Sequence, residues 1–249
     1  MPPIIETGHV INSGNFEKLI ITCTSQGAVF NPSNNRIKLP ALNTKHGDAV
    51  AALTAVSDKF ADWVKKVNKR NEVFEPLELL ITRIIGAVAS SGASKLFLGD
   101  VKTLGRKLQG QRASKKKATV PDNPQTPENE SQKSISASQL SFNSRIGNFE
   151  RLIALLLTEP LYIPNEADLT TASLTTYHGQ MVGINTEVIE AYTDLTNARD
   201  ARDKVLYEPE TGLVDLALEV KQYVKSLGGT KTDFYQNIVG LKFRRSRSK

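Results

Sequence analysis

Cysteine, histidine and aromatic residues are scarce in this sequence, and each scarcity narrows the kinds of site that the chain can carry. The single cysteine, Cys23, excludes an intramolecular disulfide and is compatible with a reducing compartment. The three histidines (His9, His46 and His178) complete no His-Glu-x-x-His pattern, and neither a Cys-x-x-Cys nor a phosphate-loop motif occurs. Aromatic residues make up 6% of the chain, and apart from Phe243 none alternates with the basic clusters, so no base-stacking surface is indicated.

Long hydrophobic runs are also missing. The longest apolar stretches, around residues 79–89 and 152–157, are short and flanked by charge, so we expect neither to span a bilayer. Residues 1–6 lack the basic start and the apolar run of a secretion signal. Carboxylates are scattered, which disfavours a di-iron carboxylate bundle. From these absences we expect a cytoplasmic protein that is not an enzyme and holds no cofactor or metal.

The sequence does contain a stretch of seven residues that occurs twice. Gly-Asn-Phe-Glu-Lys-Leu-Ile at 14–20 returns at 147–153 with Arg in place of Lys. Phe16, Leu19 and Cys23 have the spacing of one face of a helix, and the second copy keeps apolar residues at the same places. The second copy has Leu where the first has Cys23, so we expect this thiol to pack as a small apolar residue.

A long helix is expected next in each copy. His46-Gly47 matches His178-Gly179 at an offset of 132, and from there an apolar stripe recurs at alternating spacings of four and three. No proline interrupts either run, so we predict a helix of roughly 33 residues, about 50 Å long, packed lengthwise against near-parallel neighbours. Trp63 belongs to this stripe and is predicted to lie in the core, because Leu195 takes its place in the other copy.

Two shorter helices complete each copy. Both copies turn at Glu-Pro, residues 75–76 and 208–209, and the second copy has about four extra residues at this turn. We therefore predict an all-α protein, a tandem duplication of a four-helix bundle unit with one long central helix in each. The predicted domains are a first four-helix unit at 1–108, a flexible basic linker rich in Pro and Ser at 109–136, a second four-helix unit at 137–241 and a basic tail at 242–249.

The net charge of +6 is concentrated in two basic clusters, one after each predicted bundle. The functional interpretation is contact with the phosphates of nucleic acid or of an anionic membrane. The alternative is a pair of solvated tails that keep a nearly neutral protein soluble. The candidate phosphate contacts are Arg112, Lys115, Lys116, Lys117, Lys242, Arg244, Arg245, Arg247 and Lys249.

Two equivalent histidines form a further candidate site. If the bundles packed about a pseudo-twofold axis, His46 and His178 could approach each other and share a ligand or a metal. The simpler interpretation is that each His-Gly step lies in the first turns of the long helix, where glycine allows close approach of a neighbour.

Two equivalent arginines, Arg70 and Arg202, fall in the apolar stripe near one end. We expect their side chains to extend over the rim of the bundle, with Glu75 or Glu208 as a carboxylate partner. An anion site built from Arg199 and Arg202 is the functional alternative.

Three stretches resemble a family of bacterial proteins of uncharacterised function. They are Gly-Asn-Phe-Glu-Arg-Leu-Ile-Ala-Leu-Leu from Gly147, Pro-Asn-Glu-Ala-Asp-Leu from Pro164, and Val-Leu-Tyr-Glu-Pro-Glu-Thr-Gly-Leu-Val-Asp-Leu-Ala from Val205. The resemblance covers most of the chain. It implies a bacterial or phage-related helical protein, and it supplies no activity, cofactor or site residue.

These observations favour a non-enzymatic structural or protein-interaction scaffold, in which the bundles present helix faces to a protein partner or to another copy of the chain. The alternative is a nucleic-acid-associated protein that uses its two basic tails for sequence-independent phosphate contacts.

Overall fold

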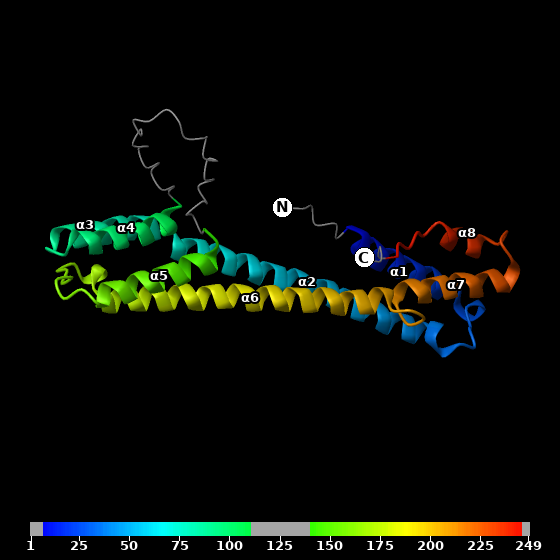
Figure 1. Ribbon diagram of the computed structural model, residues 1–249. Coiled ribbons are helices and arrows are strands. Elements are labelled where there is room, and N and C mark those ends of the chain that lie inside the picture. Colours follow the sequence, from blue (N-terminus) through cyan, green and yellow to red (C-terminus); the bar gives the residue numbers. More distant parts are fainter. Residues whose placement is uncertain (1–6, 111–139, 246–249) are drawn as a thin grey trace, which may run out of the picture. The chain divides into compact units, whose positions relative to one another are not determined.

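The computed structural model describes residues 7–110 and 140–245, and within these ranges the fold is all-α, as predicted. Every regular element in the described ranges is an α-helix or a short 3-10 helix (η), and strands are absent from them. In chain order (Figure 1) the elements are α1 Thr7–Ser25, η1 Gly27–Val29, η2 Asn35–Ile37, α2 Leu39–Phe74, α3 Leu77–Ser90, α4 Lys95–Gln109, α5 Phe142–Leu157, η3 Ala167–Leu169, α6 Thr171–Tyr207, α7 Leu213–Gly228 and α8 Asp233–Val239.

Local sequence explains where the helices begin. The hydroxyls of Ser94, Ser141 and Thr232 each accept a hydrogen bond from a backbone N–H of the first turn that follows, so they cap α4, α5 and α8. Pro76 directly precedes α3, and Gly110, in the left-handed conformation, ends α4. The two long helices are continuous over 36 and 37 residues, slightly longer than the sequence predicts.

The described helices form two compact units, and each unit takes helices from both copies of the repeat. The terminal unit is Met1–Val64 with Glu190–Lys249, and the middle unit is Lys65–Ile189. The terminal unit therefore combines α1 and the start of α2 with the end of α6, α7 and α8. The middle unit combines the end of α2, α3 and α4 with α5 and the start of α6.

This division differs from the predicted one, in which each copy forms its own bundle at 1–108 and 137–241. The reason lies in the partners of the shorter helices. In one core α1 packs with α7 and α8, and in the other α3 packs with α4 and α5. Most of the predicted linker at 109–136 lies outside the described residues, which resume at Leu140.

The core of the terminal unit joins α1 to α7 and α8, which lie beside it in Figure 1. Phe16 and Leu19 of α1 are fully buried together with Ala217 and Val220 of α7. Cys23 is buried in the same core, and this burial raises the pKa of its thiol to about 12. The thiol therefore packs as a small apolar group, as its replacement by Leu in the other copy predicts.

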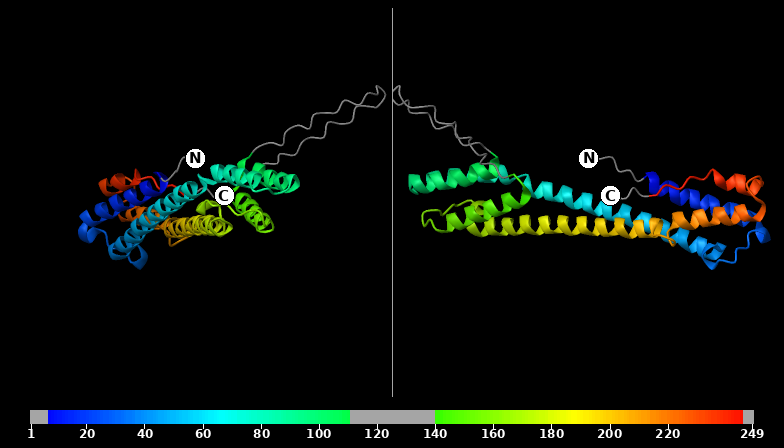
Figure 2. Two further views of the ribbon diagram at one scale, coloured as in Figure 1. Left: turned by 90° about the vertical axis from the view of Figure 1, so that its left-hand side faces the viewer. Right: turned by 45° about the vertical axis from the view of Figure 1, so that its right-hand side comes forward.

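The core of the middle unit is built from α3, α4 and α5 with the adjoining parts of α2 and α6. Ile81 and Ile84 of α3 and Leu108 of α4 pack in one cluster with Phe149 and Leu152 of α5. The turned views of Figure 2 show the same grouping of the green helices. Phe149 is the equivalent of Phe16, so the repeated stretch supplies the central aromatic residue of both cores.

Trp63 differs from its prediction. It belongs to neither core cluster and is only half-buried, with its ring centroid 5.9 Å from that of Phe60 and 6.1 Å from that of Tyr192. Tyr192 itself is 53% exposed, whereas Leu195, the equivalent of Trp63, is buried. At this part of α2 the apolar stripe therefore consists of aromatic side chains that contact one another and remain partly exposed to solvent.

Candidate functional site

Only part of the predicted phosphate-binding set lies within the described residues. Arg112, Lys115, Lys116, Lys117, Arg247 and Lys249 lie outside them. Lys242, Arg244 and Arg245 are described and exposed, but the backbone that carries them is held in place. Asn15 Nδ2 donates to the carbonyl of Lys242 at 2.8 Å. The buried Asn12 both donates to the carbonyl of Arg244 at 2.8 Å and accepts from its N–H at 2.9 Å.

A second set of contacts fixes the same segment to α7. Lys221 Nζ donates to the carbonyl of Leu241 at 2.5 Å and lies 5.3 Å from the centre of the Phe243 ring. Arg245 forms an ion pair with Asp215 of α7, with 2.8 Å between Nη2 and Oδ1. Up to Arg245 the predicted tail is thus bound to the bundle, and one of its three described cations is already neutralised.

The two equivalent histidines do not form a common site within either unit. His46 belongs to the terminal unit, where it lines a groove between α1 and α2 with Val50 and Leu53. His178 belongs to the middle unit, where its ring lies 6.4 Å from the ring of Phe149. Each histidine lies in the first turns of its long helix, as the simpler interpretation of the His-Gly step has it. The close approach of a neighbour is not seen, because no atom lies within 4 Å of a Cβ added at Gly47 or Gly179.

The stripe arginines have partners other than the predicted Glu75 and Glu208. Arg70 lies 3.8 Å above the ring of Phe142 and donates to Asn185 Oδ1 at 3.2 Å, and burial lowers its pKa. The 7% exposed Arg202 pairs with its chain neighbour Asp203, at 2.9 Å between Nη2 and Oδ1. Because this carboxylate occupies Arg202, the structure does not assemble the predicted anion site of Arg199 and Arg202.

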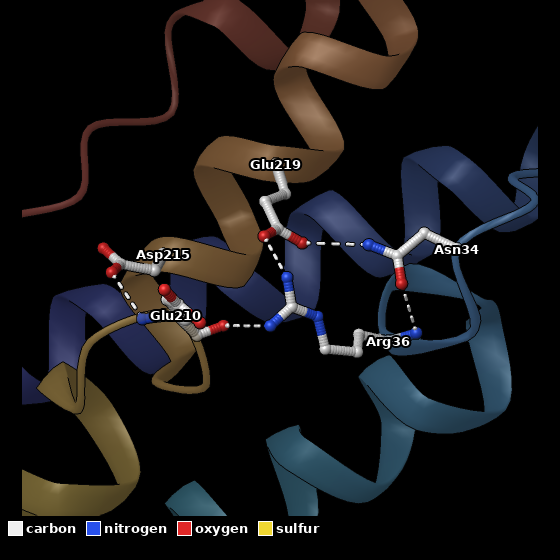
Figure 3. Close-up of polar contacts among 5 residues, drawn as sticks. All are labelled: Asn34, Arg36, Glu210, Asp215 and Glu219. Carbon is white, nitrogen blue, oxygen red and sulfur yellow. Dashed lines mark hydrogen bonds and ion pairs between the residues drawn. The ribbon is translucent and has the colours of Figure 1, made fainter.

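A cluster of polar residues lies where the connection before α2 meets α7, and we call it the polar junction: Asn34, Arg36, Glu210, Asp215 and Glu219 (Figure 3). Arg36 is at its centre. Its Nη2 pairs with Glu219 Oε1 at 2.7 Å, and its Nη1 donates to the carbonyl of Glu210 at 3.3 Å. Asn34 Nδ2 donates to the other Glu219 oxygen at 3.3 Å.

Local backbone geometry positions these groups. The side chain of Asn34 accepts from the N–H of Arg36 at 3.0 Å and so starts the short helix η2. Glu210 stands in the turn between α6 and α7, within the four residues that the second copy has in excess, and its φ is 64°. Asp215 Oδ2 accepts from the N–H of Glu210 at 3.0 Å and holds this turn in place.

The polar junction borders a hollow of about 460 Å³. The hollow is lined by four junction residues and four others: Asn34, Glu210, Asp215 and Glu219, with Ile37, Leu218, Gln222 and Arg245. Arg36 neutralises Glu219, and Arg245 neutralises Asp215, so two of the three carboxylates of the junction are paired with cations of the chain itself. This arrangement is suited to holding η2 and the α6–α7 turn against α7.

A smaller counterpart joins η3 to α3 in the middle unit. Both terminal nitrogens of Arg83 donate to the carboxylate of Asp168, with 3.0 Å between Nη2 and Oδ1. The Arg83 guanidinium lowers the pKa of Asp168. The sequence reasoning singled out none of the four ion-paired residues Arg36, Glu219, Arg83 and Asp168.

Metal sites and membrane spans are the remaining classes of site. Within residues 7–110 and 140–245, no group of three or more His, Cys, Asp or Glu side chains is arranged to hold a metal ion. In the same ranges, no helix combines the length and the apolar character that a membrane span requires.

The likeness to an uncharacterised bacterial family stays a prediction. In comparisons with protein-family models, curated proteins and solved structures, none matches this chain.

Proposed function

We propose that the chain is a non-enzymatic scaffold of the cytoplasm whose role is to bind a helical segment of a protein partner. The observation that carries this proposal is an apolar groove in the middle unit, between α3 and the start of α6. It has a volume of about 680 Å³, and its lining includes Pro76, Leu79, Leu80, Ala172 and Tyr177.

The chemistry of the groove suits a partner helix. Leu79 is 66% exposed, which is unusual for a leucine that lines a concave surface. An amphipathic helix of a partner could bury this leucine by laying its apolar face in the groove. The ion pair of Arg83 and Asp168 stands at the groove and would supply a polar rim.

Site-specific photo-crosslinking in the source cells tests the scaffold proposal. We expect a photoreactive benzoylphenylalanine at position 79 to give one defined adduct, because a bound helix would lie within reach of the probe. The same probe at Leu96, which is 83% exposed on α4 and does not line the groove, is the matched control. Filling the groove by Ala172→Arg should abolish the adduct at position 79. Equal adducts at both positions, or an adduct that survives Ala172→Arg, would contradict the proposal.

The alternative function, sequence-independent contact with nucleic acid, is favoured by one observation. Lys242 and Arg244 expose their side chains while hydrogen bonds from α1 fix their backbone, so ordering them on a phosphate chain would cost little entropy.

For this alternative we expect the variant Lys242→Glu with Arg244→Glu to bind duplex DNA and RNA about tenfold more weakly at low salt. The slope of log affinity against log salt should fall by about 1.8, since two phosphate contacts are lost. A mobility shift with the full chain measures both quantities. The control variant, Lys225→Glu with Lys231→Glu, makes the same charge change at exposed positions of the terminal unit outside the cluster. Equal losses in both variants, or no binding by the wild type at low salt, would exclude these two residues as a binding site.

A further inference from the structure

The two ion pairs that join a 3-10 helix to a neighbouring α-helix occupy equivalent positions of the repeat. Arg36 and Asp168 are equivalent at the offset of 132 that also relates His46 to His178. Arg83 and Glu219 are equivalent at the offset of 136 that relates the third helices of the two copies. Arg36–Glu219 and Arg83–Asp168 are therefore the same contact, made once in each unit.

The signs of the charges are reversed between the two contacts. The first copy carries a cation at both positions, Arg36 and Arg83, and the second copy carries an anion at both, Asp168 and Glu219. Each ion pair consequently consists of one residue from each copy. The apolar residues beside the pairs show no such reversal, because Ile37 and Leu169, equivalent to each other, are both buried.

The same contact would be unfavourable between like copies. If the first copy of one chain packed with the first copy of another, Arg36 would face Arg83. If second copies packed together, Asp168 would face Glu219. The cores would not prevent this, because the repeated stretch supplies Phe16 to one core and Phe149 to the other.

We propose that these four charged residues make the two copies specific partners for each other and prevent each copy from pairing with its own kind in a second chain. The preference comes from attraction in the mixed pairing together with repulsion in both like pairings. It concerns how the chain pairs within itself and does not depend on what binds in the groove of the middle unit.

The test uses the full chain with a protease site placed within residues 111–139. After cleavage of the folded protein, native mass spectrometry should find the two fragments in a 1:1 complex, because each core contains helices of both. The cleaved protein is then unfolded in urea and refolded by dilution. The quantity to be measured is the abundance of the mixed dimer relative to the two like dimers.

The decisive variant is the reversal Arg36→Glu with Glu219→Arg. It keeps the mixed pairing attractive, since the two exchanged charges would still face each other, but it also makes both like pairings attractive. Two like dimers together contain four such contacts, and all four change from repulsive to attractive. If each exposed contact changes by roughly a factor of 2.3, the equilibrium constant for mixed pairing should fall by about 30-fold relative to the wild type.

A matched control reverses a different ion pair between the copies, Lys66–Glu187, with 2.5 Å between Nζ and Oε2. The positions equivalent to these residues hold Ala198 and Ala55, so neither orientation of this pair creates a charge contact in a like dimer. We expect Lys66→Glu with Glu187→Lys to leave the proportions of the dimers unchanged. Circular dichroism establishes that each variant refolds. Wild-type proportions in the Arg36→Glu, Glu219→Arg variant, or an equal shift in the control, would overturn the proposal.

Discussion

Phe16→Ala should destabilise the terminal unit by about 4 kcal/mol, because Phe16 is fully buried and the truncation leaves a cavity in the core. The effect should appear in helices of the other copy. In native-state hydrogen exchange we expect protection to be lost in α7 and α8, and to be retained in α3 and α4. Phe149→Ala should give the converse pattern, with α3 and α4 losing protection.

The two truncations are controls for each other, because they remove the same side chain from equivalent positions of the repeat. Loss of protection in α3 and α4 on Phe16→Ala, with α7 and α8 unaffected, would mean that each copy folds as its own bundle. That outcome would contradict a structure in which each core contains helices of both copies.

Gly212→Ala is expected to cost about 2 kcal/mol, since it forces a methyl group into the backbone of the preceding turn. A Cβ at this position would lie 2.7 Å from both the backbone nitrogen and the carbonyl oxygen of Glu208. The turn that would have to move is the one that presents the carbonyl of Glu210 to Arg36. Urea unfolding measures the free energy of unfolding that Gly212→Ala costs. Repeating the measurement in the Glu219→Gln background, where the Arg36–Glu219 ion pair is broken, measures how strongly this cost is coupled to the polar junction.

Glu210→Gly is the matched control in the same turn. It leaves the backbone hydrogen bonds of residue 210 in place and removes a side chain from a residue with φ of 64°, so it should stabilise by about 1 kcal/mol. Stabilisation by Gly212→Ala, or destabilisation by both variants, would show that the geometry of this turn is not as described.

Much of the helical pattern could be predicted from the sequence, and the pairing of helices could not. Proline positions and the apolar stripe indicate the turns at 75–76 and 208–209 and the long helices between them. Which copy covers which apolar face is a different question. Phe16 and Phe149 present the same chemistry, so the helical pattern alone is compatible with either pairing. The contacts within the two cores show which pairing the chain adopts.

The polar junction was missed for a related reason. Arg36 and Asp168 lie in 3-10 helices of only three residues, which are too short for a periodicity that would point to a partner. Glu210 adopts a positive φ that no local pattern of residues predicts. A usable signal was nevertheless present. Comparing the sign of charge at equivalent positions, rather than counting charges, places Arg36, Arg83, Asp168 and Glu219 among the positions where the sign reverses between the copies.

The packing of α1 with helices of the other copy has a consequence for synthesis on the ribosome. The middle unit is one continuous segment, Lys65–Ile189, and can fold as soon as that segment has emerged. The helix α1 is made first, but its core partners α7 and α8 are made last, and its His9 bonds to Tyr207, 198 residues further on. We expect the apolar face of α1 to stay uncovered through most of translation, which makes nascent chains that stop before α7 natural clients of chaperones and proteases.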